Sequence, residues 1–190
     1  MICGTVPCAD AAANTPQRSI AWIFAAPKWG VLAGLILIAC CCGQMRPARA
    51  DAMARATAAY ARGDYVGAVN TLSPLALRGN AEAQAFLGFM FENGFGAPQA
   101  YDAAVGFYVQ AAIRGNPFGQ GMLGLMYDKG HGVPQDFVLA YKWLNLAAAR
   151  APKRQREYFL RLRNAVASKM SPDQIAAGQH LAMLWATGLQ

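Results

Sequence analysis

The sequence predicts an all-α protein: a solenoid of about four helical hairpins that follows an N-terminal signal or anchor segment. Residues 84–114 and 120–150 superpose without a gap at a spacing of 36 residues, and a fixed period of this size is typical of stacked helical hairpins. Apolar residues recur at three- and four-residue spacing within each unit, as a buried helix face requires. Glycine and proline interrupt this pattern in the middle of each unit, where a turn between two helices is expected.

Composition divides the 190-residue chain into two parts. Residues 1–50 form the N-terminal region and residues 51–190 the repeat domain, with units at about 52–80, 81–116 and 117–152 and a C-terminal cap at 153–186. All five cysteines precede residue 43, which excludes a disulfide or a thiolate metal site in the repeat domain. From Asp51 onward the chain has 13 Lys/Arg and 9 Asp/Glu, and this small excess does not indicate nucleic-acid binding.

The N-terminal region has the pattern of an export signal. A basic flank precedes an apolar run of 14 residues at 29–42, which is shorter than the roughly 20 residues needed to cross a bilayer. The sequence Ala48-Arg49-Ala50 then supplies a small-residue cleavage site. We therefore predict a secretory signal peptide cut between Ala50 and Asp51, which places the domain in the periplasm or cell envelope.

Two alternatives for this region remain open. The sequence L-I-A-C that ends at Cys40 resembles a bacterial lipobox, which predicts a lipid on Cys40 that anchors a lipoprotein at the membrane surface. Alternatively, the segment stays uncut and residues 20–26 help it to span the inner membrane, although Lys28 in the middle disfavours this.

Residues 52–80 form a degenerate first unit. Helices are expected at 52–61 and 65–78, separated by Gly63-Asp64. Tyr65 aligns with Tyr101 of the following unit, so the second helix follows the repeat. The turn between the two helices is shorter, as expected of an end cap.

The second and third units each begin with a helix of about 13 residues. Leu87, Met90 and Phe91 are spaced as one buried face. Gly88 and its equivalent Gly124 interrupt good helix formers. A glycine inside a helix costs about 0.5–1 kcal/mol relative to alanine, so we expect close approach of a neighbouring helix there.

The sequence G-x-G-x-P-Q joins the two helices of these units. Gly94 and Gly130 stand where a helix ends and the backbone needs a positive φ. Pro98 and Pro134 prevent the first helix from continuing. Asp136 is expected to cap the second helix of the third unit through its carboxylate.

The C-terminal cap contains two further helices, which brings the total to eight. Phe159 and Val166 belong to an apolar stripe at helical spacing. Ser171 is expected to cap the last helix, with Pro172 at its first position.

The second and third units resemble the Sel-one-like repeat, a short relative of the tetratricopeptide repeat. The resemblance rests on A-x-A-Q-x-x-L-G-x-M-[FY]-x-x-G-x-G-x-P-Q-x-[YF]-x-x-A-x-x-[FW]-x-x-x-A-A, which covers residues 81–150 strongly and 52–80 and 153–186 weakly. It implies a right-handed α/α superhelix that serves as an adaptor or scaffold for other proteins, and it implies no single activity. Ala100 departs from the pattern, since the next unit has Asp136 at this position.

One apolar deviation predicts a partner-binding surface. Phe86 and Phe89 align with Met122 and Leu125, beside the packing positions of the first helices. If the first helices line an inner curve, these four side chains form an apolar groove, and exposed apolar patches mark binding sites. The alternative is ordinary packing between repeats, and burial of all four side chains would exclude the groove.

No catalytic, cofactor-binding or metal-binding residue is predicted. His131 and His180 lie on different units and share no ligand spacing with carboxylates. Glu92 and Asp128 occupy the same position of successive units, which favours helix-end electrostatics over a catalytic acid pair. The basic run at 150–163 is interpreted as the solvated face of a capping helix or as a contact for anionic lipid or an acidic partner.

These observations predict a non-enzymatic scaffold or adaptor that mediates protein–protein interaction in the bacterial cell envelope. Its partner is expected to be a protein or peptide, with no cofactor and no nucleic acid, and membrane association would come from the N-terminal segment. The alternatives are an envelope hydrolase acting on cell-wall or small substrates and a membrane-apposed structural protein. A hydrolase would need a polar pocket with an acid or histidine of shifted pKa.

Overall fold

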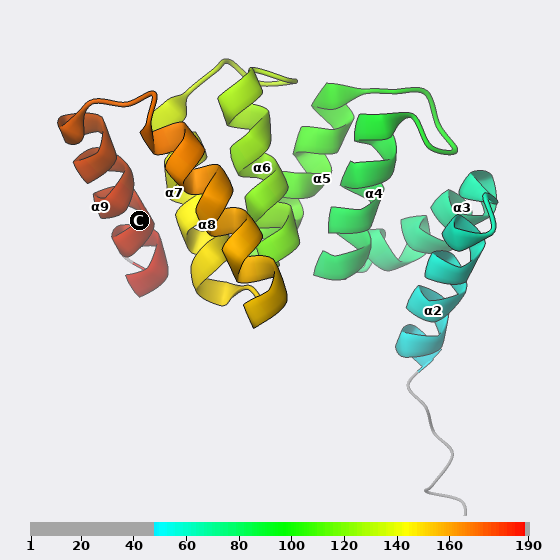
Figure 1. The fold of residues 1–190 in the computed structure, drawn as a ribbon. Helices are drawn as coiled ribbons and strands as arrows, with labels where there is room; N and C mark the ends of the chain where they lie inside the picture. The colour runs from blue at the N-terminus through cyan, green and yellow to red at the C-terminus, as the bar shows by residue number, and fades with distance from the viewer. Residues whose placement is uncertain (1–47, 189–190) are drawn as a thin grey trace, which may run out of the picture. The chain divides into compact units, whose positions relative to one another are not determined.

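The computed structural model describes residues 48–188, which contain eight α-helices and no strand (Figure 1). The helices are α2 (Ala48–Ala61), α3 (Tyr65–Leu77), α4 (Ala81–Asn93), α5 (Tyr101–Ile113), α6 (Pro117–Lys129), α7 (Phe137–Arg150), α8 (Lys153–Ala167) and α9 (Pro172–Thr187). The prediction of an all-α solenoid of sequential hairpins is confirmed.

The predicted features of the N-terminal region lie mostly beyond this part of the chain. Cys40 and the apolar run at 29–42 are outside the described residues, while Ala50 and Asp51 belong to α2. Within residues 48–188, none of the helices has both the length and the apolar character of a membrane span. Cleavage, lipidation and anchoring stay predictions.

Each helix from α2 to α7 packs against the next one along the chain (Figure 1). The last helix differs, because α9 packs mainly against α7. Gly178 makes this contact close: a Cβ atom there would lie 2.9 Å from the Tyr141 ring and 3.2 Å from the carbonyl oxygen of Val138. Both helices of the C-terminal cap therefore rest on α7.

The glycines inside the first helices mark close helix contacts, as predicted. A Cβ atom at Gly88 would lie 2.7 Å from the ring of Tyr108 on α5. At the equivalent Gly124 it would lie 2.8 Å from Leu144 on α7. A side chain at either position would force the two helices of the hairpin apart.

The turn sequence closes each first helix in the same way. Gly94 and Gly130 are left-handed C-caps, both with φ of 71°, as predicted. The side-chain amides of Gln99 and Gln135 then donate to the carbonyl oxygens of Glu92 and Asp128, each at 2.7 Å. These bonds satisfy carbonyls that the helix end leaves without a partner, which accounts for the glutamine of G-x-G-x-P-Q.

A buried glutamine connects successive units. Gln84 donates to the carbonyl oxygen of Ala76 at 3.0 Å, and Gln120 donates to that of Ala112 at 3.1 Å. Both side chains are almost fully buried. Each bond joins a first helix to the end of the helix before it, so the unit-to-unit contact is specified by hydrogen bonding as well as by apolar packing.

The capping predictions are also confirmed. The Asp136 carboxylate accepts from the backbone N–H of Leu139 at 2.9 Å, and Ser171 forms a capping box with Gln174. Ala100 has nearly the same backbone conformation as Asp136, with φ of −148° and −149° respectively. Its methyl side chain cannot accept a hydrogen bond from the backbone N–H groups at the start of α5. The departure of Ala100 from the repeat pattern therefore leaves α5 without a side-chain cap.

Candidate functional site

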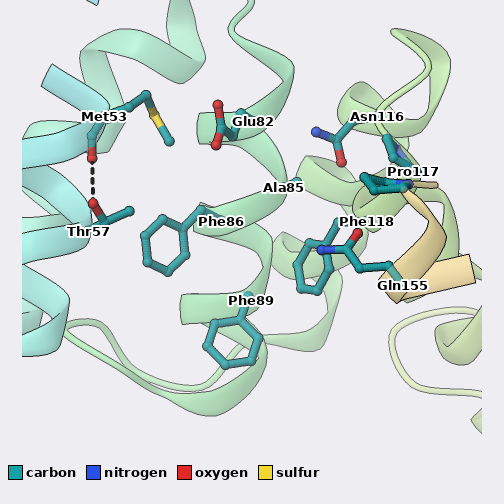
Figure 2. Close-up of a pocket in the computed structure, with 11 residues that line it drawn as sticks. Met53, Thr57, Glu82, Ala85, Phe86, Phe89, Asn116, Pro117, Phe118 and Gln155 are labelled. Carbon is teal, nitrogen blue, oxygen red and sulfur yellow. Dashed lines mark hydrogen bonds between the residues drawn. The ribbon is translucent and has the colours of Figure 1, made fainter. Parts of the chain in front are cut away.

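The first helices of successive hairpins, α2, α4, α6 and α8, surround a cavity of about 570 Å³ (Figure 2). We call it the aromatic groove. It is lined by Met53, Thr57, Glu82, Ala85, Phe86, Phe89, Asn116, Pro117, Phe118, Pro152 and Gln155. The lining includes residues 116–118 and 152–155, so the starts of α6 and α8 form part of its wall.

Three phenylalanine side chains make the groove apolar. Phe86 and Phe89 come from α4 and Phe118 from α6 (Figure 2). The ring centroids of Phe86 and Phe89 are 6.5 Å apart, and those of Phe89 and Phe118 are 6.4 Å apart. All three side chains are only partly buried. Helices from two successive units therefore share one aromatic surface that remains open to solvent.

Further aromatic residues contact the rings of this surface. Tyr60 of α2 contacts Phe86 edge-on, with ring centroids 5.3 Å apart. Tyr60 also contacts Phe95, and Phe95 stacks on Tyr65 at 4.8 Å. Such aromatic pairs contribute about 0.5–1.5 kcal/mol each beyond the area they bury. The cluster connects α2, the start of α3, α4 and the turn after α4.

The polar residues of the lining are neutral, with one exception. Glu82, in the first turn of α4, is the single ionisable side chain among the lining residues, and no histidine is present there. Asn116 caps α6 by accepting from the backbone N–H of Gly119 at 2.8 Å. Thr57 is satisfied by the carbonyl oxygens of Met53 and Ala54. The lining therefore assembles no acid–base pair.

The four side chains predicted to bind a partner are all half-buried, but they do not share one cavity. Phe86 and Phe89 line the aromatic groove. Met122 packs against the core cluster around α5, α6 and α7, and Leu125 is half-buried outside the lining. Their use by a partner stays a prediction. Sequence reasoning missed Phe118, which aligns with Glu82 of the preceding unit; an aromatic residue in place of a charged one was the available signal.

Both histidines lie outside the groove. His131, in the turn after α6, has its ring 4.5 Å from that of Tyr101, measured between centroids. His180 is exposed on α9. In the described part of the chain, no three His, Cys, Asp or Glu side chains gather as a metal site.

Two ionisable groups with shifted pKa lie away from the groove. Burial raises the pKa of Tyr108 well above its usual value. The Glu92 carboxylate, which accepts from the Tyr108 hydroxyl at 2.7 Å, raises this pKa further through the hydrogen bond and its negative charge. Burial lowers the pKa of Lys142, whose ammonium lies over the rings of Trp143 and Trp185 at 4.7 and 4.6 Å. Both groups join helices to one another, which is a structural role.

Comparison with known proteins identifies the repeat. The Sel1 repeat matches residues 81–116 and 117–151. A protective antigen of uropathogenic Escherichia coli strains with an SLR fold is 26% identical, with a TM-score of 0.65 over 72% of this chain and 30% of that one. A Sel1 repeat protein from Oxalobacter formigenes is 27% identical, with a TM-score of 0.52 over 56% of this chain and 44% of that one. No curated protein matches. The chain thus spans less than half the length of both structures.

Proposed function

We propose that this chain, which carries two Sel1 repeats and has their solenoid fold, is a non-enzymatic scaffold that holds a peptide segment of another protein in the aromatic groove. The observation that carries the proposal is the shared aromatic surface of Phe86, Phe89 and Phe118, which is open to solvent. A peptide side chain that covers such rings gains about 25 cal/mol for each Å² of apolar surface removed from water.

The size and polarity of the groove suit a peptide. Its volume of about 570 Å³ lies within the roughly 300–1,000 Å³ of ligand sites that combine an apolar lining with a few polar groups. Among the described residues, the side-chain NH₂ group of Asn116 and the side-chain amide of Gln155 make no hydrogen bond. These amides are available to pair with the peptide backbone, while the phenylalanines take an apolar side chain.

The scaffold is proposed to act in the cell envelope. The basic flank, the apolar run at 29–42 and the Ala48-Arg49-Ala50 site support export. Mass spectrometry of the chain purified from its host should find Asp51 at the mature N-terminus. A diacylated Cys40 would instead indicate a lipoprotein, and an intact Met1 would contradict processing of either kind.

Loss of a groove ring is expected to weaken peptide binding. Random peptides selected on the chain should carry an aromatic or branched apolar residue, since this is what the rings can cover. The Phe86→Ala and Phe89→Ala variants should each bind the selected peptides about tenfold more weakly, because burying a phenylalanine is worth about 1.5–3 kcal/mol. Fluorescence anisotropy measures the affinity, and circular dichroism checks that the variants are folded.

Leu77→Ala is the matched control, because this side chain is 88% exposed on α3 and lies outside the groove. It should bind the peptides as the wild type does. Equal affinities for Leu77→Ala, Phe86→Ala and Phe89→Ala would refute the proposal, as would a selection that yields no binding peptide.

A further inference from the structure

A second cavity, of about 310 Å³, lies between α7 and α8. It is lined by Asn145, Ala148 and Ala149 of α7 and by Arg156, Leu160 and Arg163 of α8. The three α8 residues follow one another at spacings of four and three, which places them on the same face of that helix. This cavity shares no residue with the aromatic groove. We call it the arginine pocket.

The guanidinium of Arg163 is held in place from three sides. Its Nη1 donates to Asn145 Oδ1 at 3.1 Å, and its Nη2 and Nε donate to Asn164 Oδ1 at 2.9 and 3.3 Å. Its Cζ lies 5.9 Å from the centroid of the Tyr141 ring. A guanidinium has five N–H donors, so two donors of Arg163 remain without a protein acceptor in the described structure.

Arg156 has more free donors. Its Nη2 donates to the carbonyl oxygen of Ala151 at 3.4 Å, and among the described residues its other four N–H groups have no acceptor. The single ion pair among residues 51–188 joins Lys169 and Asp128, so no carboxylate there pairs with either arginine. Arg156 is exposed and Arg163 is half-buried, so two positive charges line one open cavity without a protein counter-charge, and an anion from solvent can reach both.

The surroundings of the pocket are basic as well. Six lysines and arginines and one acid, Glu157, lie between residues 150 and 163. A positive surface of this kind speeds the encounter with a negatively charged partner. A solvated capping face accounts for the overall charge of this segment, but it does not account for the fixed orientation of Arg163 toward α7.

We propose that the arginine pocket binds a carboxylate side chain from an acidic segment of a partner protein. The planar fork of a guanidinium matches the two oxygens of a carboxylate. The apolar half of the lining, Leu160 with Ala148 and Ala149, can receive the methylene groups that carry the carboxylate. An amino-acid side chain with its backbone fills a 310 Å³ cavity better than a bare inorganic ion does.

The test uses a fluorescent hexaglutamate peptide with the wild-type chain and two double variants. R156Q/R163Q removes both pocket charges. R154Q/R161Q removes the same charge from exposed positions of α8 outside the pocket. We expect the first variant to bind the peptide about tenfold or more weakly, as loss of charge-assisted hydrogen bonds implies, and the second to lose about threefold or less.

Three outcomes would overturn the proposal. Equal losses in the two double variants would mean that charge alone attracts the peptide. Displacement of the peptide by inorganic phosphate at equal concentration would make the pocket a site for small anions. Binding to vesicles containing phosphatidylserine, without binding to the peptide, would make it a lipid contact.

Two further variants keep the result interpretable. R156K/R163K preserves the charge and removes the planar guanidinium groups, so it should also bind hexaglutamate more weakly than the wild type. This variant replaces R156Q/R163Q in the test if R156Q/R163Q does not fold. The Phe86→Ala variant should bind hexaglutamate as tightly as the wild type, because Phe86 lies outside the pocket. Failure at the pocket and failure at the groove are therefore separate results.

Discussion

Replacement of Gly132 with alanine should destabilise the protein by about 2–5 kcal/mol. Gly132 has a φ of +70°, a left-handed conformation that costs a residue with a side chain about 1–2 kcal/mol. A Cβ atom there would also lie 2.6 Å from the carbonyl carbon and 2.7 Å from the carbonyl oxygen of Tyr101. These are backbone atoms, so the contact can be relieved only by moving the turn away from α5, and overpacking of this kind adds about 1–3 kcal/mol.

Gly130→Ala separates the two contributions. Gly130 has almost the same φ, +71°, but its nearest neighbour, Gln135 Cβ, would be 3.4 Å from the new methyl group. Only the left-handed conformation should then cost free energy, about 1–2 kcal/mol. Urea denaturation followed by circular dichroism measures both variants. Equal losses of stability would show that the turn does not depend on close contact with the preceding unit.

Tyr108→Phe should lower the free energy of unfolding by about 1.5–3 kcal/mol at pH 7, the usual contribution of a hydrogen bond to a charged group. Tyr108 is fully buried, and its hydroxyl donates to Glu92 Oε2 at 2.7 Å. Phenylalanine keeps the ring that packs against Gly88 and removes only the hydroxyl group. Urea denaturation of the variant and the wild type measures the difference.

The same substitution should matter less at high pH. Burial and Glu92 raise the pKa of Tyr108 above the value of about 10 that tyrosine has in an unfolded chain. Below pH 10 the hydroxyl is protonated in both states and its stabilisation is fully present. Above pH 10 the unfolded state loses the proton first, so this contribution falls by about 1.4 kcal/mol per pH unit. The gap between the wild type and Tyr108→Phe should therefore close between about pH 10 and 12.

Tyr158→Phe is the control for this pH dependence. The side chain of Tyr158 is 47% exposed and makes no hydrogen bond within the described structure. This variant removes an exposed hydroxyl that has no partner, so its free energy of unfolding should stay within about 0.5 kcal/mol of the wild-type value. A gap that stays constant for Tyr108→Phe would contradict the assignment of the alkaline loss of stability to Tyr108.

The two complete repeats use the same position in different ways. Glu92 and Asp128 are equivalent in sequence, and Tyr108 is equivalent to Leu144. Glu92 accepts from Tyr108. In the next unit Leu144 has no polar group to donate, and Asp128 pairs with Lys169, which follows α8, at 2.8 Å. The acid of each unit thus bonds to a partner that the repeat pattern does not specify.

Local chemistry made most of the fold predictable. The 36-residue period is visible in the sequence itself. The left-handed Gly94 and Gly130 and the caps at Asp136 and Ser171 follow from rules that act within a few residues. Phe86 and Phe89 were candidates for the same reason, since they occupy helix positions beside the packing face. Each of these inferences concerns neighbours in the chain or a single helix face.

The sites required the tertiary structure. Phe118 completes the aromatic groove although its equivalent, Glu82, is charged. Arg156 and Arg163 line one pocket with Asn145 only because α8 packs on α7. A stack of α-hairpins could be predicted from the order of the amino acids, because helix periodicity and turn chemistry are short-range properties. The packing of the hairpins decided which side chains from different hairpins line a common cavity. Each helix has several faces, and contacts between residues distant in the sequence determine which face is turned toward a neighbouring helix.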